Sequence, residues 1–180
     1  MRLVADGRPV EPREVAEAAG LPVGQVEGFL RAQPGTDWDD DGQIAGFGLT
    51  LRPTPHRFVV EDRVLYTWCA TDTLVFPTIL GRGAVVESTC PVTSRPIRLE
   101  VTPDAVVSVE PPTTVVSQVH PAEAVEDIRG VVCRHGHFFS SPQAASDWAT
   151  DHPEGQVLSV CEAFDCARAA CESLGWARSS

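Results

Sequence analysis

The sequence predicts an α+β fold, in which an N-terminal winged-helix-like unit packs on a mostly antiparallel β core with flanking helices. Apolar residues recur at helical spacing within the first 32 residues. From residue 53 onward, short apolar runs separated by proline-containing turns replace that pattern, which is typical of antiparallel strands. Helical patterns return in only three later segments. We therefore expect a winged helix-turn-helix-like lid at residues 1–52 and a core domain at residues 53–180.

Two short helices and a hairpin make up the expected lid. Pro12 fits the first turn of a helix that Gly20 ends, and apolar residues predict a second helix over residues 23–32. Three aspartates and a glycine at residues 39–42 predict a turn. The alternation of apolar residues that follows predicts a strand over residues 47–51. Together these elements resemble a winged helix-turn-helix.

The core is expected to consist mainly of strands. The predicted strands cover residues 56–60, 64–66, 84–88, 97–101, 106–109, 115–119, 131–139 and 157–160. The predicted helices run from the Cys69 segment to Gly81, from about residue 141 to 149, and from about residue 163 to 174. Pro77 lies inside the first of these helices, so a kink or an early stop is expected there.

The charge of the chain argues against nucleic acid as a partner. The formal net charge is −11, from 14 basic and 25 acidic residues. The lid has five basic residues (Arg2, Arg8, Arg13, Arg31, Arg52) against nine acidic ones (Asp6, Glu11, Glu14, Glu17, Glu27, Asp37, Asp39, Asp40, Asp41). Affinity for a phosphate backbone comes mostly from Lys and Arg. We expect a structural lid that binds no nucleic acid.

Composition also bears on location. The N-terminus lacks the apolar segment of a secretory signal, and no apolar run is long enough to cross a bilayer. We therefore expect a cytoplasmic protein with no membrane association. In that reducing compartment the six cysteines are expected to be free thiols.

Cys69 and Asp72 are the most informative residues. On a helix, their three-residue spacing would place a thiol and a carboxylate on one face. This pair supplies a nucleophile or soft-metal ligand beside a proton acceptor. Two plainer interpretations remain open at this stage: Cys69 as a small buried hydrophobe, and Asp72 as an exposed or turn-capping residue. Trp68 and Phe76 would shelter such a pair from water.

Cys133 is the second candidate thiol, distant in sequence. With His135 and His137 it forms a period-two series that one strand face could present, and thiolate and imidazole are zinc ligands. No Cys-x-x-Cys pair accompanies the series, so we prefer partly buried histidines that hydrogen-bond to the backbone. Cys90, at a strand-to-turn junction, is expected to be structural.

The C-terminal cysteines recur every five residues. This spacing rotates a helix by about 140°, so Cys166 and Cys171 should not share a face and a helical metal cluster is not expected. Two interpretations stay open: auxiliary thiols, or Cys161 facing the core from the last strand.

Taken together, these segments resemble the organomercurial (alkylmercury) lyases. The resemblance covers nearly the whole chain from Gly7 onward, and it rests on four stretches in one order: residues 42–51, 65–77, 133–139 and 162–164. It implies that residues 53–180 are the lyase catalytic core. It further implies that Cys69, Asp72 and Cys133 are the catalytic trio, and that Cys90 is the family's structural cysteine.

The chain departs from the family pattern at three points. It lacks a longer N-terminal helix, it has Arg134 where many members have a second cysteine, and it has Cys161 where a histidine is common. The first change leaves the lid less covered. The other two affect how mercury is held or passed on and leave the trio intact.

The chemistry that the resemblance implies is protonolysis of a carbon–mercury bond. One cysteine gives its proton to Asp72 and binds the mercury of R–Hg⁺, the second thiolate adds, and Asp72 protonates the departing carbon to give R–H. Hg(II) then stays on Cys69 and Cys133, with Asp72 beside it, until a low-molecular-weight thiol or mercuric reductase takes it. No cofactor is required.

Two alternatives remain. The first is a soft-metal-binding or metal-sensing module of the same fold without turnover. The second is a relative that acts on copper, another soft metal or a different carbon–heteroatom bond.

Overall fold

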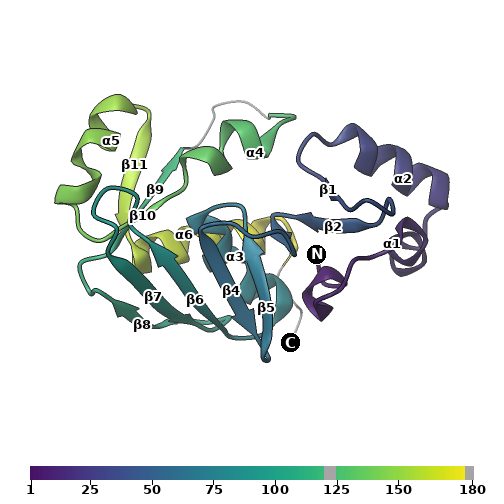
Figure 1. Ribbon diagram of the computed structural model, residues 1–180, viewed down its shortest axis with the longest axis horizontal. Helices are drawn as coiled ribbons and strands as arrows, with labels where there is room; N and C mark the ends of the chain where they lie inside the picture. The colour runs from purple at the N-terminus through teal and green to yellow at the C-terminus, as the bar shows by residue number, and fades with distance from the viewer. Residues whose placement is uncertain (120–124, 177–180) are drawn as a thin grey trace.

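The computed structural model describes residues 1–119 and 125–176 and confirms the α+β class. Its strands form one eight-stranded sheet, in the order β1-β2-β3-β5-β4-β6-β7-β8, and one three-stranded sheet, in the order β10-β9-β11. Every pairing between neighbouring strands is antiparallel. Figure 1 shows the N-terminal unit at one end of the molecule, with β1 and β2 extending from it toward the core.

The N-terminal unit is built as predicted from two helices and a hairpin. After a 3-10 turn at Val4–Asp6, α1 (Pro12–Ala19) begins with a proline in its first turn and ends at Gly20 in the left-handed conformation. Helix α2 (Val23–Ala32) follows directly. The hairpin consists of β1 (Asp37–Trp38) and β2 (Ile44–Phe47) on either side of the aspartate-rich turn.

The strand predicted over residues 47–51 is interrupted. Gly48 adopts φ +76°, a left-handed conformation that glycine adopts at little cost, and the chain reverses there. Strand β3 (Leu49–Thr50) therefore pairs back with β2, with Phe47 opposite Leu49. The alternating apolar pattern predicts strand correctly for Phe47 and Leu49, but these residues lie in two different strands and Leu51 lies outside both.

Strand β3 also links the N-terminal unit to the core. It pairs with β5 (Arg63–Thr67), which forms a hairpin with β4 (His56–Val60). The rest of the large sheet is β6 (Ala84–Thr89), β7 (Pro96–Val101) and β8 (Val106–Glu110). Alternating burial along β4, β6 and β7 shows that one sheet face is covered and the other is open.

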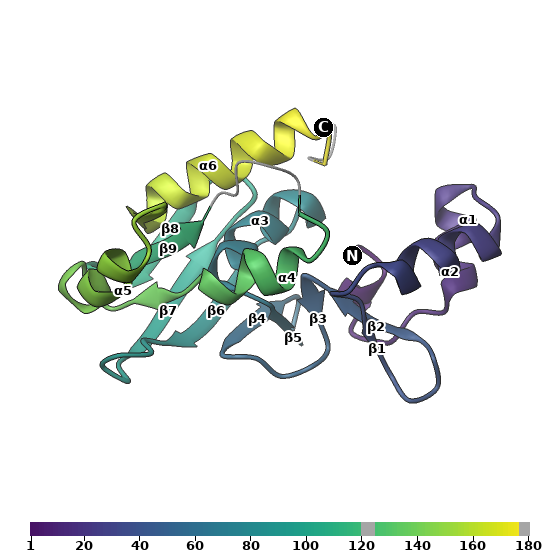
Figure 2. The ribbon, with the colours of Figure 1, turned by 90° about the horizontal axis from the view of Figure 1, so that it is seen from above.

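Helices α3 (Ala70–Leu80) and α6 (Val160–Ser173) lie beside each other on the covered face (Figure 2). Their apolar side chains join Phe58, Val86 and Leu99 of the sheet in the main hydrophobic core. The expected early stop at Pro77 is wrong, because α3 continues for one more turn. Gly81 ends it by donating from its N–H to the carbonyl of Pro77.

The strand predicted over residues 131–139 is also wrong. Residues Ile128–Val131 form the short helix α4, Cys133–His135 form a 3-10 turn, and only Phe138–Phe139 form a strand, β10. Asp127 starts α4 by accepting a hydrogen bond from the backbone N–H of Gly130 at 2.8 Å. This cap and the tertiary contacts of the turn outweigh the β propensity of the valines.

The small sheet contains β9 (Val115–Val119), with β10 on one side and β11 (Gly155–Ser159) on the other. The helix expected from about residue 141 is divided into a 3-10 turn at Gln143–Ala145 and α5 (Ser146–Asp151). Val160, expected in the last strand, instead begins α6, because Ser159 and Glu162 form a capping box there. None of the helices in the described ranges is long and apolar enough to span a membrane.

Candidate active site

Cys69, Asp72 and Cys133 converge in space. One ligand atom from each residue, a sulfur or a carboxylate oxygen, lies within 4.8 Å of the other two. The Sγ of Cys133 lies 3.9 Å from Oδ2 of Asp72, which is within reach of a weak S–H···O hydrogen bond. Two thiols and one carboxylate therefore face one point, although 61 residues of sequence separate Asp72 from Cys133.

The start of helix α3 positions the first two groups. Cys69 is the N-cap residue, with an extended backbone, and Asp72 lies in the first turn. We expected both residues inside a helix, but the helix begins one residue after Cys69, and only Asp72 lies within it. The outcome is similar, because N-cap and third-position side chains face each other across the first turn. The positive end of the helix dipole also lies here and favours negative charge.

The turn that follows α4 supplies Cys133. This 3-10 turn lies against strand β9, where the hydroxyl of Ser117 donates to the carbonyl of His135 at 2.7 Å and accepts from the N–H of His137 at 3.0 Å. The carbonyl of Gly136 accepts a hydrogen bond from the N–H of Ala70 at 3.1 Å. The Cys133 segment is thus tied to both the small sheet and the first residue of α3.

Burial and proximity change the acidity of the trio. The hydrogen bond with Cys133, burial and the neighbouring carboxylate together raise the pKa of Cys69 well above its usual range. Burial raises the pKa of Asp72 to about 6, against the opposing effect of hydrogen bonds from both thiols. Cys69 is therefore a protonated thiol at neutral pH, and Asp72 titrates close to neutrality, where a group can both accept and donate a proton.

A cavity of about 520 Å³ opens beside the trio. Asp72 and Cys133 are among its lining residues, whereas Cys69 is only 3% exposed and is not. The wall is mostly apolar, formed by Phe47, Trp68, Val75, Phe76, Ile79, Ile128 and Trp176. The expectation that Trp68 and Phe76 shelter the site is confirmed. The cavity suits an apolar group attached to a thiophilic atom.

Comparison with known proteins identifies the family. The family model "Alkylmercury lyase" matches residues 49–172, and the model "Helix-turn-helix domain of alkylmercury lyase" matches residues 1–48. The chain belongs to the alkylmercury lyase family. The alkylmercury lyase of Staphylococcus epidermidis is 47% identical over 168 residues, which cover 93% of this chain and 77% of the relative. That of Streptomyces lividans is 48% identical over 174 residues, covering 97% and 80%.

A solved structure of this lyase family has the same fold. The mercury-bound form of MerB2 superposes with a TM-score of 0.79 at 25% identity, covering 95% of this chain and 85% of that one. The resemblance stated from the sequence is confirmed by these matches. The winged-helix-like character of the N-terminal unit agrees with the helix-turn-helix model. The boundary between residues 52 and 53 stays a prediction.

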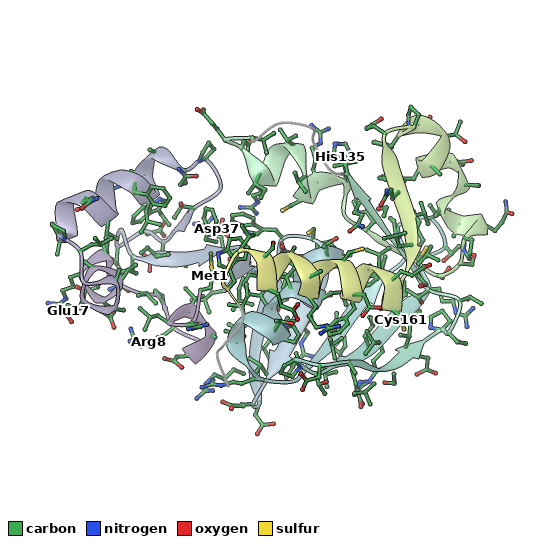
Figure 3. The ribbon with its side chains drawn as sticks, turned by 180° about the vertical axis from the view of Figure 1, so that it is seen from behind. Met1, Arg8, Glu17, Asp37, His135 and Cys161 are labelled. Carbon is green, nitrogen blue, oxygen red and sulfur yellow. The ribbon has the colours of Figure 1, made fainter. Side chains whose placement is uncertain are left out.

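Sequence reasoning missed a clamp on Trp68, a wall residue of the lyase cavity. The indole N–H of Trp68 donates to Oδ2 of Asp37 at 3.0 Å, and Arg129 pairs with Oδ1 of the same carboxylate at 2.8 Å. The Arg129 guanidinium also lies 4.8 Å from the Trp68 ring centroid. Figure 3 shows Asp37 between the N-terminal unit and the core. No local pattern signals this clamp, because its members come from three distant segments.

The remaining candidate ligands lie apart from the trio. His135 and His137 are half-buried, which agrees with the partial burial in the interpretation we preferred. Within residues 1–119 and 125–176, the trio is the only group of three potential metal ligands whose ligand atoms converge, so Cys133, His135 and His137 do not gather around one point as the zinc interpretation requires. The 3-10 turn explains this, because its side chains do not share one face.

The other cysteines are free thiols, as expected. Cys90 is fully buried at the turn after β6. Cys166 is exposed and Cys171 is buried, so these two do not share a face of α6. Cys161 is exposed in the first turn of α6 and does not face the core from the last strand (Figure 3). Arg134, next to Cys133, is exposed as well.

Proposed function

We propose that Cys69, Asp72 and Cys133 cleave the carbon–mercury bond of small organomercurials, R–Hg⁺, and that the products are R–H and Hg(II). The observation that carries this assignment is the convergence of the three ligand atoms within 4.8 Å beside an apolar cavity. Hg(II) is a soft ion that prefers thiolate ligands, and protonolysis needs an acid next to the metal-bound carbon. The trio supplies both.

Cys133 captures the substrate first, because it lines the cavity whereas Cys69, the more buried of the two thiols, does not. In the cell an organomercurial is bound to a thiolate, R–Hg–SR′. The sulfur of Cys133 replaces that thiolate, and the proton of Cys133 leaves with the displaced thiol as R′SH. The apolar R group then lies against the aromatic wall formed by Phe47 and Trp68, whose rings are 5.2 Å apart.

Cys69 then adds to the mercury. Since its raised pKa keeps it protonated, it needs a base, and the carboxylate of Asp72 accepts the proton. The second thiolate increases electron density on mercury and weakens the bond to carbon. Protonated Asp72 delivers the same proton to the departing carbon. The balance is R–Hg–SR′ plus two cysteine thiols, giving R–H, R′SH and Hg(II) bound by two thiolates, with Asp72 returned to its starting state.

The product requires an acceptor. We propose that low-molecular-weight thiols remove Hg(II) by exchange and that mercuric reductase is a further acceptor. The reaction requires no cofactor, since thiols and a carboxylate supply every proton and ligand. A cytoplasmic location follows from the same chemistry, because a reducing compartment keeps Cys69 and Cys133 as thiols.

We expect no nucleic acid partner despite the helix-turn-helix resemblance. Helix α2, the second helix of the motif, carries one basic residue, Arg31. That guanidinium is paired with Glu27 at 2.8 Å and lies over the Trp38 ring. A recognition helix would need free cations facing the phosphates.

Release of benzene from phenylmercury in excess thiol, followed by gas chromatography, tests the proposal. Cys69→Ser and Cys133→Ser should each abolish benzene release while far-UV circular dichroism stays native. Asp72→Ala should bind mercury but fail to protonate the carbon. Normal turnover in any of the three variants contradicts the assignment. No hydrocarbon from the wild type would favour a metal-binding module without turnover.

A separate measurement tests the order in which Cys133 and Cys69 bind the mercury. Intact-protein mass spectrometry should show a phenylmercury adduct that persists on Cys69→Ser, because Cys133 still captures the substrate. The adduct should be reduced on Cys133→Ser. A Cys69→Ser/Cys133→Ser double variant gives the background from the exposed cysteines Cys161 and Cys166. The reverse pattern would make Cys69 the entry thiol.

A further inference from the structure

Gly136 lies where the two cysteine-bearing segments touch. A Cβ added at this position would meet Cβ of Cys69 at 2.9 Å and Sγ of Cys69 at 3.2 Å. It would also lie 3.6 Å from the carbonyl oxygen of Cys133. The first distance is shorter than van der Waals contact between two carbon atoms allows. Position 136 therefore has no room for a side chain.

The backbone conformation does not explain this glycine. Gly136 has φ −90° and ψ 99°, which any L-residue can adopt. The glycines at positions 48 and 81 differ, because their φ angles are +76° and +67°. Close approach of the backbone to a side chain is the remaining reason for glycine, and the side chain approached is Cys69.

The segment around Gly136 cannot easily move away from Cys69. Ser117, fully buried on β9, holds the carbonyl of His135 and the N–H of His137 with its hydroxyl. The N–H of Ser117 also donates to the carbonyl of His137 at 3.0 Å. The Gly136 carbonyl accepts from Ala70, the residue after Cys69. The contact is therefore fixed from both sides of the glycine.

We infer that Gly136 is a positioning residue that sets the separation of the Cys69 and Cys133 sulfurs, by letting the Cys133 turn dock directly on the N-cap of α3. This inference rests on the proposed function of the two thiols. A methyl group at position 136 would displace the Cys69 side chain, because the anchored turn cannot retreat. Both thiols would remain present, but they would no longer meet on one mercury ion.

The first test compares Gly136→Ala with Gly28→Ala. Gly28 is the matched control, because an added Cβ there meets nothing within 4 Å and α2 lies outside the site. A displacement of about 1 Å can cost about 100-fold in rate, so Gly136→Ala should lower kcat for phenylmercury by ~10- to 100-fold with a smaller change in KM. Gly28→Ala should keep the wild-type kcat.

The second readout does not require turnover. Hg(II) affinity is measured by competition with dithiothreitol, with Cys133→Ser as the baseline for one active-site thiol. The Hg(II) affinity of Gly136→Ala should fall toward that baseline by at least ~10-fold, because two-thiolate chelation is lost. Failure of the proposed function can be distinguished from failure of this inference. If only the proposed function fails, the wild type gives no benzene, but the competition still separates the Hg(II) affinity of Gly136→Ala from that of Gly28→Ala.

Ser117→Ala keeps the inference testable if Gly136→Ala does not fold. Loss of the hydroxyl loosens the turn instead of crowding it, so kcat and Hg(II) affinity should also fall, by a smaller factor. Circular dichroism and thermal unfolding establish that each variant is folded. Wild-type kcat and wild-type Hg(II) affinity in folded Gly136→Ala would overturn the inference. If Gly136→Ala does not fold, wild-type kcat and wild-type Hg(II) affinity in folded Ser117→Ala would overturn the inference.

Discussion

At the scale of single residues, the site depends on a carboxylic acid that titrates near neutrality. Burial raises the pKa of Asp72 to about 6, although part of the side chain still faces the cavity. A carboxyl group with an ordinary pKa would be almost fully ionised at neutral pH and would rarely hold a proton for the carbon. A permanently protonated carboxyl group could not accept the thiol proton of Cys69. An intermediate pKa allows both steps.

This pKa predicts a pH dependence of catalysis. The active form of the free enzyme has Asp72 ionised, so kcat/KM for phenylmercury should be half-maximal near pH ~6, level off above pH ~7, and approach a tenfold fall per pH unit only well below the pKa. The measurement is benzene release at subsaturating phenylmercury from about pH 5 to about pH 8, a range that lies on both sides of the Asp72 pKa. A profile that is flat through pH 5 would show that Asp72 is not the proton acceptor.

The same shift predicts a pH dependence of stability. The folded pKa of Asp72 is raised above its ordinary value of 3.8, so the folded state binds more protons than the unfolded state between these values. The free energy of unfolding should therefore fall as pH rises from about 4 to about 6, by ~1–2 kcal/mol after allowance for the exposed edge.

Asp72→Asn isolates this contribution, because asparagine does not titrate. Relative to wild type, the variant should be inactive and more stable above pH ~6, with the difference shrinking toward pH ~4. Urea unfolding of both proteins at several pH values measures the difference. If the free energies of unfolding of the two proteins differ by the same amount at every pH, Asp72 has its ordinary pKa in the folded protein.

At the scale of elements, three segments meet around Trp68. Strand β1 contributes Asp37, the end of β5 leads into Trp68, and α4 contributes Arg129. This clamp immediately precedes Cys69 in the chain and closes one side of the cavity. It joins the N-terminal unit to the catalytic core at the point where Cys69 is held.

Asp37→Ala should destabilise the protein. The buried indole N–H of Trp68 loses its acceptor, which costs ~1–3 kcal/mol, whereas half-exposed Arg129 can turn to water. Asp40→Ala is the matched control, because Asp40 is exposed in the neighbouring turn and its loss should cost less than ~0.5 kcal/mol. Urea denaturation midpoints measure both. Equal midpoints for the two variants would contradict a stabilising clamp.

At the scale of the whole molecule, one sheet runs through the N-terminal unit and the core. Strands β2 and β3 pair within the first 50 residues, and β3 pairs with β5 beyond them. Breaking the unit away would therefore expose strand edges and the indole of Trp68. The unit is built into the fold, in addition to covering the cavity through Phe47.

We therefore expect one cooperative unfolding transition. Tryptophan fluorescence, which includes Trp38 in the N-terminal unit and Trp68 at its junction with the core, should change at the same urea concentration as far-UV circular dichroism. A separate early fluorescence transition would show that the N-terminal unit unfolds independently.

The sequence by itself determined the local elements and the chemical types of the site. Turn residues and apolar spacing determined the α+β class and most strand positions, because these are local signals. The pairing of Cys69 with Asp72 was readable for the same reason, since both lie within one helical turn. Resemblance to a family, not spacing, added Cys133 to them.

Tertiary structure decided what local patterns do not contain. The valines around Cys133 favour a strand, but docking on β9 and the N-terminus of α3 makes the segment a helix and a tight turn. The Asp37 clamp and the contact of Gly136 with Cys69 join residues more than 30 positions apart. Hydrogen bonds and steric contacts of this kind depend on three-dimensional distance, which a one-dimensional pattern does not specify.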